Sequence, residues 1–69
     1  MVGEVTIWWD RIGAARRNGN SFENVKYVTI SKMYVTLEGP IATGMLHEMF
    51  EKDKVGSIAI HGDVEIILE

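Results

Sequence analysis

The stretch GPIATGMLHEMFEKDKVG, residues 39–56, decides the predicted fold because it is the one helical pattern in a chain that otherwise alternates like strands. Its apolar residues recur at i, i+1, i+4, i+5, i+8 and i+9, which is the spacing of an amphipathic helix. Pro40 suits the first helical turn, and Gly56 suits a left-handed stop after the last one. We therefore predict a helix here. Its apolar stripe consists of Ile41, Ala42, Met45, Leu46, Met49 and Phe50.

The preceding stretch VKYVTISKMYVTLE, residues 25–38, predicts strand structure. It is too rich in β-branched and aromatic residues to favour a helix. Its apolar residues change phase after Ile30, and a two-residue turn at Ser31–Lys32 would return both sets to a single face. A bulge in one long strand is the alternative, because it would change the phase in much the same way.

The N-terminal stretch predicts the first strand by alternation. Val5, Ile7 and Trp9 fall on one face, while Trp8 falls on the other with polar residues. Strand geometry therefore separates the two adjacent tryptophans, and we predict that Trp9 joins the core. Trp8 is then presented on the polar face.

Asn18–Gly19 is the strongest hairpin signal in the chain, since both residue types tolerate the positive φ of a type I′ turn. A turn there pairs Trp9 with Val28 and Ile7 with Ile30, apolar against apolar. Residues 10–17, DRIGAARR, form an arm of this hairpin in that interpretation, or a helical turn in a looser connection. Both interpretations keep the two strands antiparallel.

The C-terminal stretch SIAIHGDVEIILE, residues 57–69, predicts a hairpin. Gly62 supplies the left-handed position that a three-residue loop needs. Ile67 falls on the outer face, where an apolar residue indicates an edge or an oligomer contact. The expected inner face consists of Ile58, Ile60, Val64, Ile66 and Leu68.

The resulting order, three strands, a helix and two strands, predicts a single small domain over residues 1–69 that is mainly β with one helix. A five-stranded, partly open, OB-like antiparallel barrel has this order. The alternative is a swapped-hairpin dimeric barrel. From Met33 onward the order of strand, proline, helix, charged EKDK and hairpin resembles the bacterial transition-state regulators of the AbrB type. That resemblance implies two interlocked chains that bind DNA.

The composition favours a homo-oligomer in the cytoplasm. A chain of 69 residues buries a small core, and the absence of cysteine excludes disulfides as a second source of stability. A second subunit or a well-packed core remains as the source, and we expect the homo-oligomer. No apolar run approaches the 18–20 residues or so that a membrane span needs, and the N-terminus lacks the pattern of a signal peptide. We expect no membrane contact.

The net charge of −3 is unevenly distributed along the chain. Residues 1–35 carry a net +2, and residues 36–69 carry a net −5. A division of this kind favours head-to-tail contacts or an oppositely charged partner, although a chance imbalance is common in so short a chain.

The sequence offers little for catalysis or metal binding, and we predict neither an enzyme nor a cofactor. Zinc and iron sites need three or four converging ligands, and the candidates are His47, His61 and carboxylates. Ser57, His61 and Asp63 are close in sequence, but four residues of extended chain hold the serine and the histidine roughly 13 Å apart. The glycine-rich patterns that cradle phosphate are also missing.

The residues that remain indicate a binding surface. Trp, Tyr and Arg are the residue types that most often dominate protein interfaces. We therefore predict a non-enzymatic binding or regulatory module that acts by protein–protein contact, including self-association, with an unknown partner. The alternative is binding of single-stranded nucleic acid by base stacking, or of DNA, which the negative net charge opposes. The candidate binding residues are Trp8, Arg11, Arg16, Arg17, Tyr27 and Tyr34.

Overall fold

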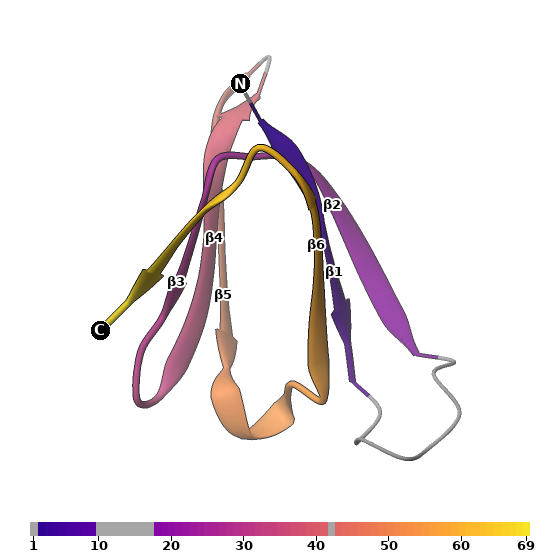
Figure 1. The fold of residues 1–69 in the computed structure, drawn as a ribbon, viewed down its shortest axis with the longest axis vertical. Coiled ribbons are helices and arrows are strands. Elements are labelled where there is room, and N and C mark those ends of the chain that lie inside the picture. Colours follow the sequence, from indigo (N-terminus) through magenta and orange to yellow (C-terminus); the bar gives the residue numbers. More distant parts are fainter. Residues whose placement is uncertain (1, 10–17, 42) are drawn as a thin grey trace.

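Two facing β-sheets form the structure, a computed structural model that describes residues 2–9, 18–41 and 43–69 (Figure 1). The first sheet has the order β2–β1–β6 and contains β1 (Gly3–Trp8), β2 (Gly19–Val25) and β6 (Ser57–Gly62). The second sheet has the order β5–β4–β3–β7 and contains β3 (Tyr27–Ile30), β4 (Tyr34–Ile41), β5 (Gly44–Glu51) and β7 (Glu65–Leu68). A short 3₁₀ turn, η1 (Lys52–Lys54), connects β5 to β6.

The predicted fold class is wrong in two respects. No α-helix occurs in the described ranges, and the strands form two separate sheets instead of one five-stranded OB-like barrel. The swapped-hairpin barrel fails for the same reason, because its element order also needs a helix after Pro40. The chain is mainly β, as predicted, but it has an open two-layer arrangement.

The segment predicted as a helix forms a β-hairpin. β4 and β5 pair antiparallel, with Ile41 opposite Gly44 and Pro40 opposite Met45. A pattern of i, i+1, i+4, i+5 places one residue of each apolar pair on each face of a strand. Leu46 and Phe50 therefore pack against the core, and Met45 and Met49 are exposed on the outer face. Ala42 lies outside the described residues.

The helical prediction failed because the apolar spacing fits both periods, and pairing with β4 decides between them. Gly44 has a φ of +141°, a backbone conformation that a helix interior does not contain. Strand formation leaves the two methionines exposed, whereas a helix would have buried them with Leu46 and Phe50.

Gly39 is required where the two sheets approach each other. It is buried in β4, and a methyl group at this position would overlap the carbonyl oxygen of Asn24 at the end of β2. Directly after this contact the chain leaves the first sheet, and the Lys26 N–H donates to the Glu38 carbonyl at 2.8 Å. The close approach thus fixes the corner at which β2 passes into β3.

β1 and β2 are antiparallel, as predicted, but their predicted register is wrong. Ile7 lies opposite Asn20 and Trp8 lies opposite Gly19, so Asn18–Gly19 is not the turn of this hairpin. Val28 and Ile30, the predicted partners of β1, belong to the other sheet. Local turn chemistry is a weaker constraint than burial of apolar residues between two sheets. The predicted arm or helical turn at residues 10–17 lies outside the described residues.

The hairpin between β3 and β4 is confirmed, with its turn one residue later than predicted. Ile30 lies opposite Val35, so the turn falls on Lys32–Met33. The Ser31 N–H donates to the Tyr34 carbonyl at 2.9 Å, and the Tyr34 N–H donates to the Ser31 hydroxyl at 3.1 Å. The serine side chain stabilises a turn that contains neither glycine nor asparagine.

The predicted C-terminal hairpin is wrong. β6 pairs antiparallel with β1, whereas β7 pairs parallel with β3 in the other sheet. Asp63–Val64 carries the chain across, and Gly62 has the predicted positive φ, at +88°. Figure 1 shows β6 and β7 diverging from this connection, which leaves them as edge strands of different layers.

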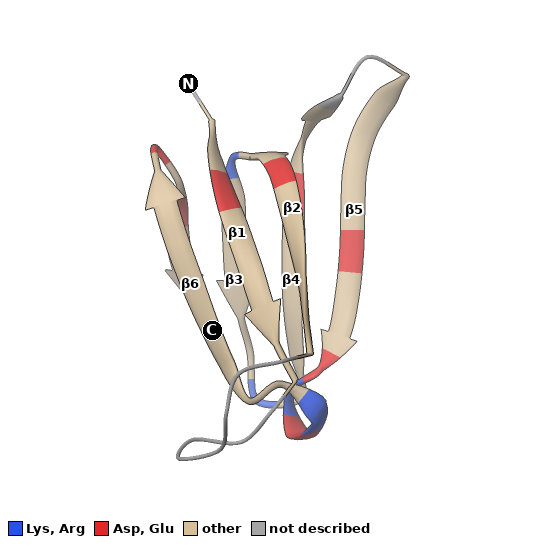
Figure 2. Cartoon of the chain, turned by 90° about the vertical axis from the view of Figure 1, so that its right-hand side faces the viewer, with Lys and Arg blue, Asp and Glu red and all other residues tan. Residues whose placement is uncertain are grey.

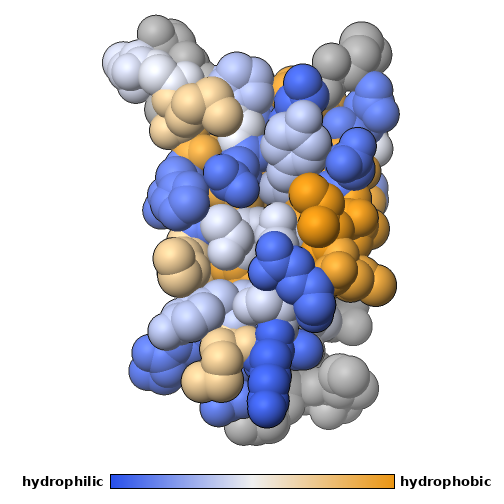
Figure 3. All heavy atoms as spheres, turned by 90° about the vertical axis from the view of Figure 1, so that its left-hand side faces the viewer, coloured by the Kyte–Doolittle hydropathy of each residue, from blue (hydrophilic) through white to orange (hydrophobic). Residues whose placement is uncertain are grey.

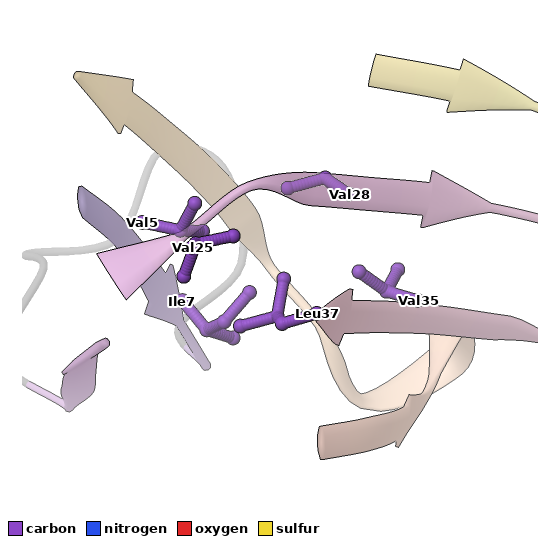
Figure 4. Close-up of a cluster of buried hydrophobic side chains, with 6 residues drawn as sticks. All are labelled: Val5, Ile7, Val25, Val28, Val35 and Leu37. Carbon is purple, nitrogen blue, oxygen red and sulfur yellow. The ribbon is translucent and has the colours of Figure 1, made fainter. Parts of the chain in front are cut away.

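The core lies between the two sheets and takes side chains from both (Figure 4). Val5 and Ile7 are buried as predicted, and Trp9 packs against the cluster while remaining half-buried. Within the described ranges, the buried hydrophobic residues are Val5, Ile7, Val25, Val28, Val35 and Leu37, each 0–1% exposed. This is a small core, and partly buried hydrophobic residues pack around it.

Candidate interaction surface

The structure places the predicted aromatic contact residues on opposite faces of the molecule. Trp8 is half-buried on the outer face of the first sheet, where a methyl group on the neighbouring Gly19 would lie 2.6 Å from its ring. Tyr27 and Tyr34 lie on the outer face of the second sheet. These three residues therefore do not share a surface, and the predicted arginines at 11, 16 and 17 lie outside the described residues.

The described ranges contain no group of three or more metal-ligating side chains. His47 Nδ1 lies 3.6 Å from Glu38 Oε2, with both side chains exposed on the outer face. His61 is exposed near the end of β6, and Ser57 stands at the beginning of the same strand. The Ser57 hydroxyl is buried without a hydrogen-bond partner.

The free edges of the two sheets lie on two different sides of the molecule (Figure 2). β2 and β5 bound one side, which we call the aromatic side. β6 and β7 bound the other, which we call the aliphatic side. The two sides differ in side chains, charge and backbone regularity.

Three aromatic rings pack edge-on or tilted on the aromatic side. The ring of Phe50 lies 5.3 Å from that of Trp9 and 5.6 Å from that of Phe22, between centroids. The Trp9 indole N–H donates to Asn20 Oδ1 at 2.8 Å, which fixes the ring against β2. A cavity of about 530 Å³ opens beside them and is lined by Trp9, Met49, Phe50, Glu51 and Lys54.

The edge strands of the aromatic side are poor templates for a further strand. β2 carries a register shift against β1 and ends near Asn24, whose φ of 60° breaks the regular extended backbone. In β5, Glu48 lies opposite Leu37 and therefore on the inner face. Irregular backbone and inward-pointing charge are two devices that keep an edge strand from pairing with another chain.

On the aliphatic side no charged side chain of β6 or β7 points inward, and the positive φ is confined to Gly62, the last residue of β6. β6 contains no lysine, arginine, aspartate or glutamate and is drawn entirely in tan in Figure 2. Its Ile58 and Ile60 pack against the core but remain half-buried. In β7, Ile66 and Leu68 lie opposite Val28 and Ile30, on the inner face, yet they are 51% and 76% exposed. Figure 3 shows apolar side chains gathered along the β7 edge of the second sheet.

The backbone of β7 is also unpaired along its outer edge. The N–H groups of Glu65 and Glu69 donate to the carbonyls of Lys26 and Ile30, both at 2.9 Å. Successive residues of a strand direct their backbone groups to opposite edges. Ile66 and Leu68 therefore direct their N–H and C=O groups away from β3, toward the free edge.

Glutamates flank the apolar part of this edge. Glu65 and Glu69 alternate with Ile67 on the outer face, and both are exposed. In the part of the chain that the structure describes, the ion-pair contact is that of His47 with Glu38, so neither glutamate of β7 has a cationic partner there. The edge therefore consists of three apolar residues with a glutamate on each side.

Sequence reasoning identified this strand only in part. Ile67 was the predicted edge or oligomer contact, but it is half-buried on the outer face beside Thr29. The more exposed residues are its neighbours Ile66 and Leu68, which the sequence placed in the core. The available signal was three consecutive apolar residues between glutamates, a pattern in which both faces of the strand are apolar.

No family model, no curated protein and no solved structure matches this chain. None of the helical structure in the described ranges has the length and hydropathy that crossing a membrane requires.

Proposed function

We propose that this protein is a non-enzymatic interaction module that binds a partner protein through its aliphatic side. One observation carries the proposal: Ile66 and Leu68 lie on the inner face of a sheet and are still 51% and 76% exposed, beside an unpaired backbone edge. Apolar side chains next to free N–H and C=O groups match what another polypeptide offers. A small polar ligand would leave the apolar groups uncovered.

The size of the core supports the same function. Covering exposed apolar side chains of this kind contributes roughly 1–2 kcal/mol for each residue. In a domain whose described core is six side chains, that gain is a sizeable fraction of the total stability. Binding would therefore stabilise the fold, and the partner's affinity would draw on residues that the isolated chain leaves in water.

The test compares two double variants that remove similar amounts of exposed apolar surface. Ile66→Ser with Leu68→Ser changes the aliphatic side, and Met45→Ser with Met49→Ser changes the outer face, where exposure is 62% and 54%. Each variant and the wild type is used to isolate proteins from the cells that produce it. We expect partners common to the wild type and the methionine variant to be absent with the aliphatic variant. Retention by all three proteins would contradict the proposal.

The homo-oligomer that chain size predicts is tested separately, by sedimentation of the wild-type protein at micromolar concentration. Nucleic-acid binding receives less support. Trp8 lies on one outer face and the tyrosines on the other, so they form no common stacking platform. The glutamates of β7 would also repel phosphate.

A further inference from the structure

We propose that the partner supplies an extended segment with the pattern basic–apolar–apolar–apolar–basic, which adds to β7 as an antiparallel strand. This inference rests on the proposed function and specifies its partner. It follows from three properties of residues 65–69: the direction of their backbone groups, the exposure of their side chains and their charge.

The backbone defines how a strand would add. In an antiparallel pair, residues exchange both hydrogen bonds at every second position. The β7 residues whose groups face the free edge are Ile66 and Leu68, because Glu65 and Glu69 donate to β3. A segment pairing with this edge would therefore form its hydrogen bonds at these two positions and would extend the second sheet by one strand.

The side chains define the middle of the segment. Residues directly opposite each other in antiparallel strands lie on the same face and about 5 Å apart. The two residues opposite Ile66 and Leu68 would lie on the inner face and cover side chains that are now 51% and 76% exposed. The residue opposite Ile67 would lie on the outer face beside a half-buried isoleucine. All three positions favour apolar residues.

The charges define the two ends. The residues opposite Glu65 and Glu69 would face carboxylates that have no ion pair within the described ranges. Lys26, which precedes β3, holds its Nζ 5.5 Å from the ring centre of Tyr27 and does not neutralise Glu65. Lysine or arginine at both ends of the segment would form two exposed ion pairs and would exclude acidic competitors.

A second copy of this chain fits the edge poorly in the register that pairs all of residues 65–69. The register that places Ile66 of each copy opposite Leu68 of the other also places Glu65 opposite Glu69, twice. Like charges directly opposite each other destabilise an antiparallel pair. The same apolar core with basic ends removes this conflict, which is why the structure favours a different chain over self-pairing at β7.

The experiment titrates the full ¹⁵N-labelled protein with two end-blocked peptides, Lys-Val-Ile-Val-Lys and Glu-Val-Ile-Val-Glu, and follows backbone amide shifts by NMR. We expect shifts centred on Ile66 and Leu68, and about tenfold tighter binding of the lysine peptide at low salt. The difference should largely disappear at about 0.5 M salt, where exposed charges are screened. A lysine peptide N-methylated at the two positions that face Ile66 and Leu68 should bind at least about tenfold more weakly, because the ladder cannot form.

Two protein variants give the matched comparison. Glu65→Lys with Glu69→Lys should reverse the preference in favour of the glutamate peptide. Met45→Ser with Met49→Ser leaves β7 unchanged and should preserve the preference for lysine.

Each alternative result overturns the inference in its own way. Equal binding of both peptides at β7 would refute the basic ends and leave the proposed function standing. Shifts confined to the outer face, or no shifts while the Ile66→Ser, Leu68→Ser variant still loses its cellular partners, would refute strand addition alone. If that variant also retains its partners, the proposed function fails as well.

Discussion

The aromatic and aliphatic sides of this molecule differ in how they cover the rim of the core. Each is bounded by two edge strands, and each must cover the rim of a small core. On the aromatic side the ring centre of Phe50 lies within 5.6 Å of those of Trp9 and Phe22, and an inward glutamate occupies the edge strand β5. On the aliphatic side the rim residues are isoleucine and leucine, and two of them remain largely in water.

The difference shows how a small protein can use one side to stabilise its core and leave the other side open for binding. Large side chains complete the core at one rim, while backbone irregularity and charge keep that rim from pairing. In the other rim, β7 keeps a regular backbone and exposed apolar residues, which is the combination that natural sheets normally avoid. We propose that its retention here marks a surface that another chain covers.

The largest expected effect on the free energy of unfolding comes from removing the ring contacts on the aromatic side. Phe50→Ala removes the ring that contacts both Trp9 and Phe22 and should lower the free energy of unfolding by about 3 kcal/mol. Leu68→Ala, which removes a side chain that is 76% exposed, should lower it by less than about 1 kcal/mol. Urea denaturation of both variants measures the contrast. Equal losses would show that the two rims contribute alike to stability.

A smaller effect is expected at the irregular end of β2. Asn24 has a φ of 60°, a left-handed conformation that costs a residue with a Cβ about 1–2 kcal/mol. Asparagine tolerates this conformation better than alanine does, so Asn24→Ala should destabilise the protein by about 1 kcal/mol. Asn24→Gly is the control and should be neutral or slightly stabilising in the same denaturation experiment. A loss with glycine that equals the loss with alanine would mean that the asparagine side chain itself is required.

The third prediction concerns the edge strand β5, which should become able to pair with another copy when its inward charge is removed. Glu48 is half-buried on the inner face of β5, opposite Leu37. Glu48→Leu removes the inward charge and should change the free energy of unfolding by less than about 1 kcal/mol. It should also make the protein self-associate through β5, which light scattering over a range of concentrations detects. Glu51→Leu, on the outer face of the same strand, is the control and should associate less.

The alternation along a strand and the burial of its apolar face could be predicted from the sequence. These predictions were right where the pattern on one face of a strand was enough to determine the structure. Val5 and Ile7 alternate with polar residues and are buried, and the turn after Ile30 returns the apolar face of the next strand to the core. Gly62 was predicted to have a positive φ because few other residues adopt it readily, and it does.

The remaining features depend on which strands meet, which local patterns do not determine. The spacing of Leu46 and Phe50 fits a helix and a strand equally, so only the partner β4 decides. Asn18–Gly19 has good turn chemistry, but burial places Gly19 opposite Trp8 within a strand pair. The parallel pairing of β7 with β3 joins segments almost forty residues apart, and the exposed face of Ile66 and Leu68 follows from that pairing alone.

Amide hydrogen exchange of the isolated protein reports whether the backbone groups of Ile66 and Leu68 are unpaired. We expect fast exchange at these two residues and slow exchange at Ile67 and Glu69, whose N–H groups face β3. Adding the lysine-flanked peptide should protect Ile66 and Leu68. Protection of Ile66 and Leu68 in the isolated monomer, equal to that of Ile67, would mean that this edge is already paired and would refute strand addition at β7.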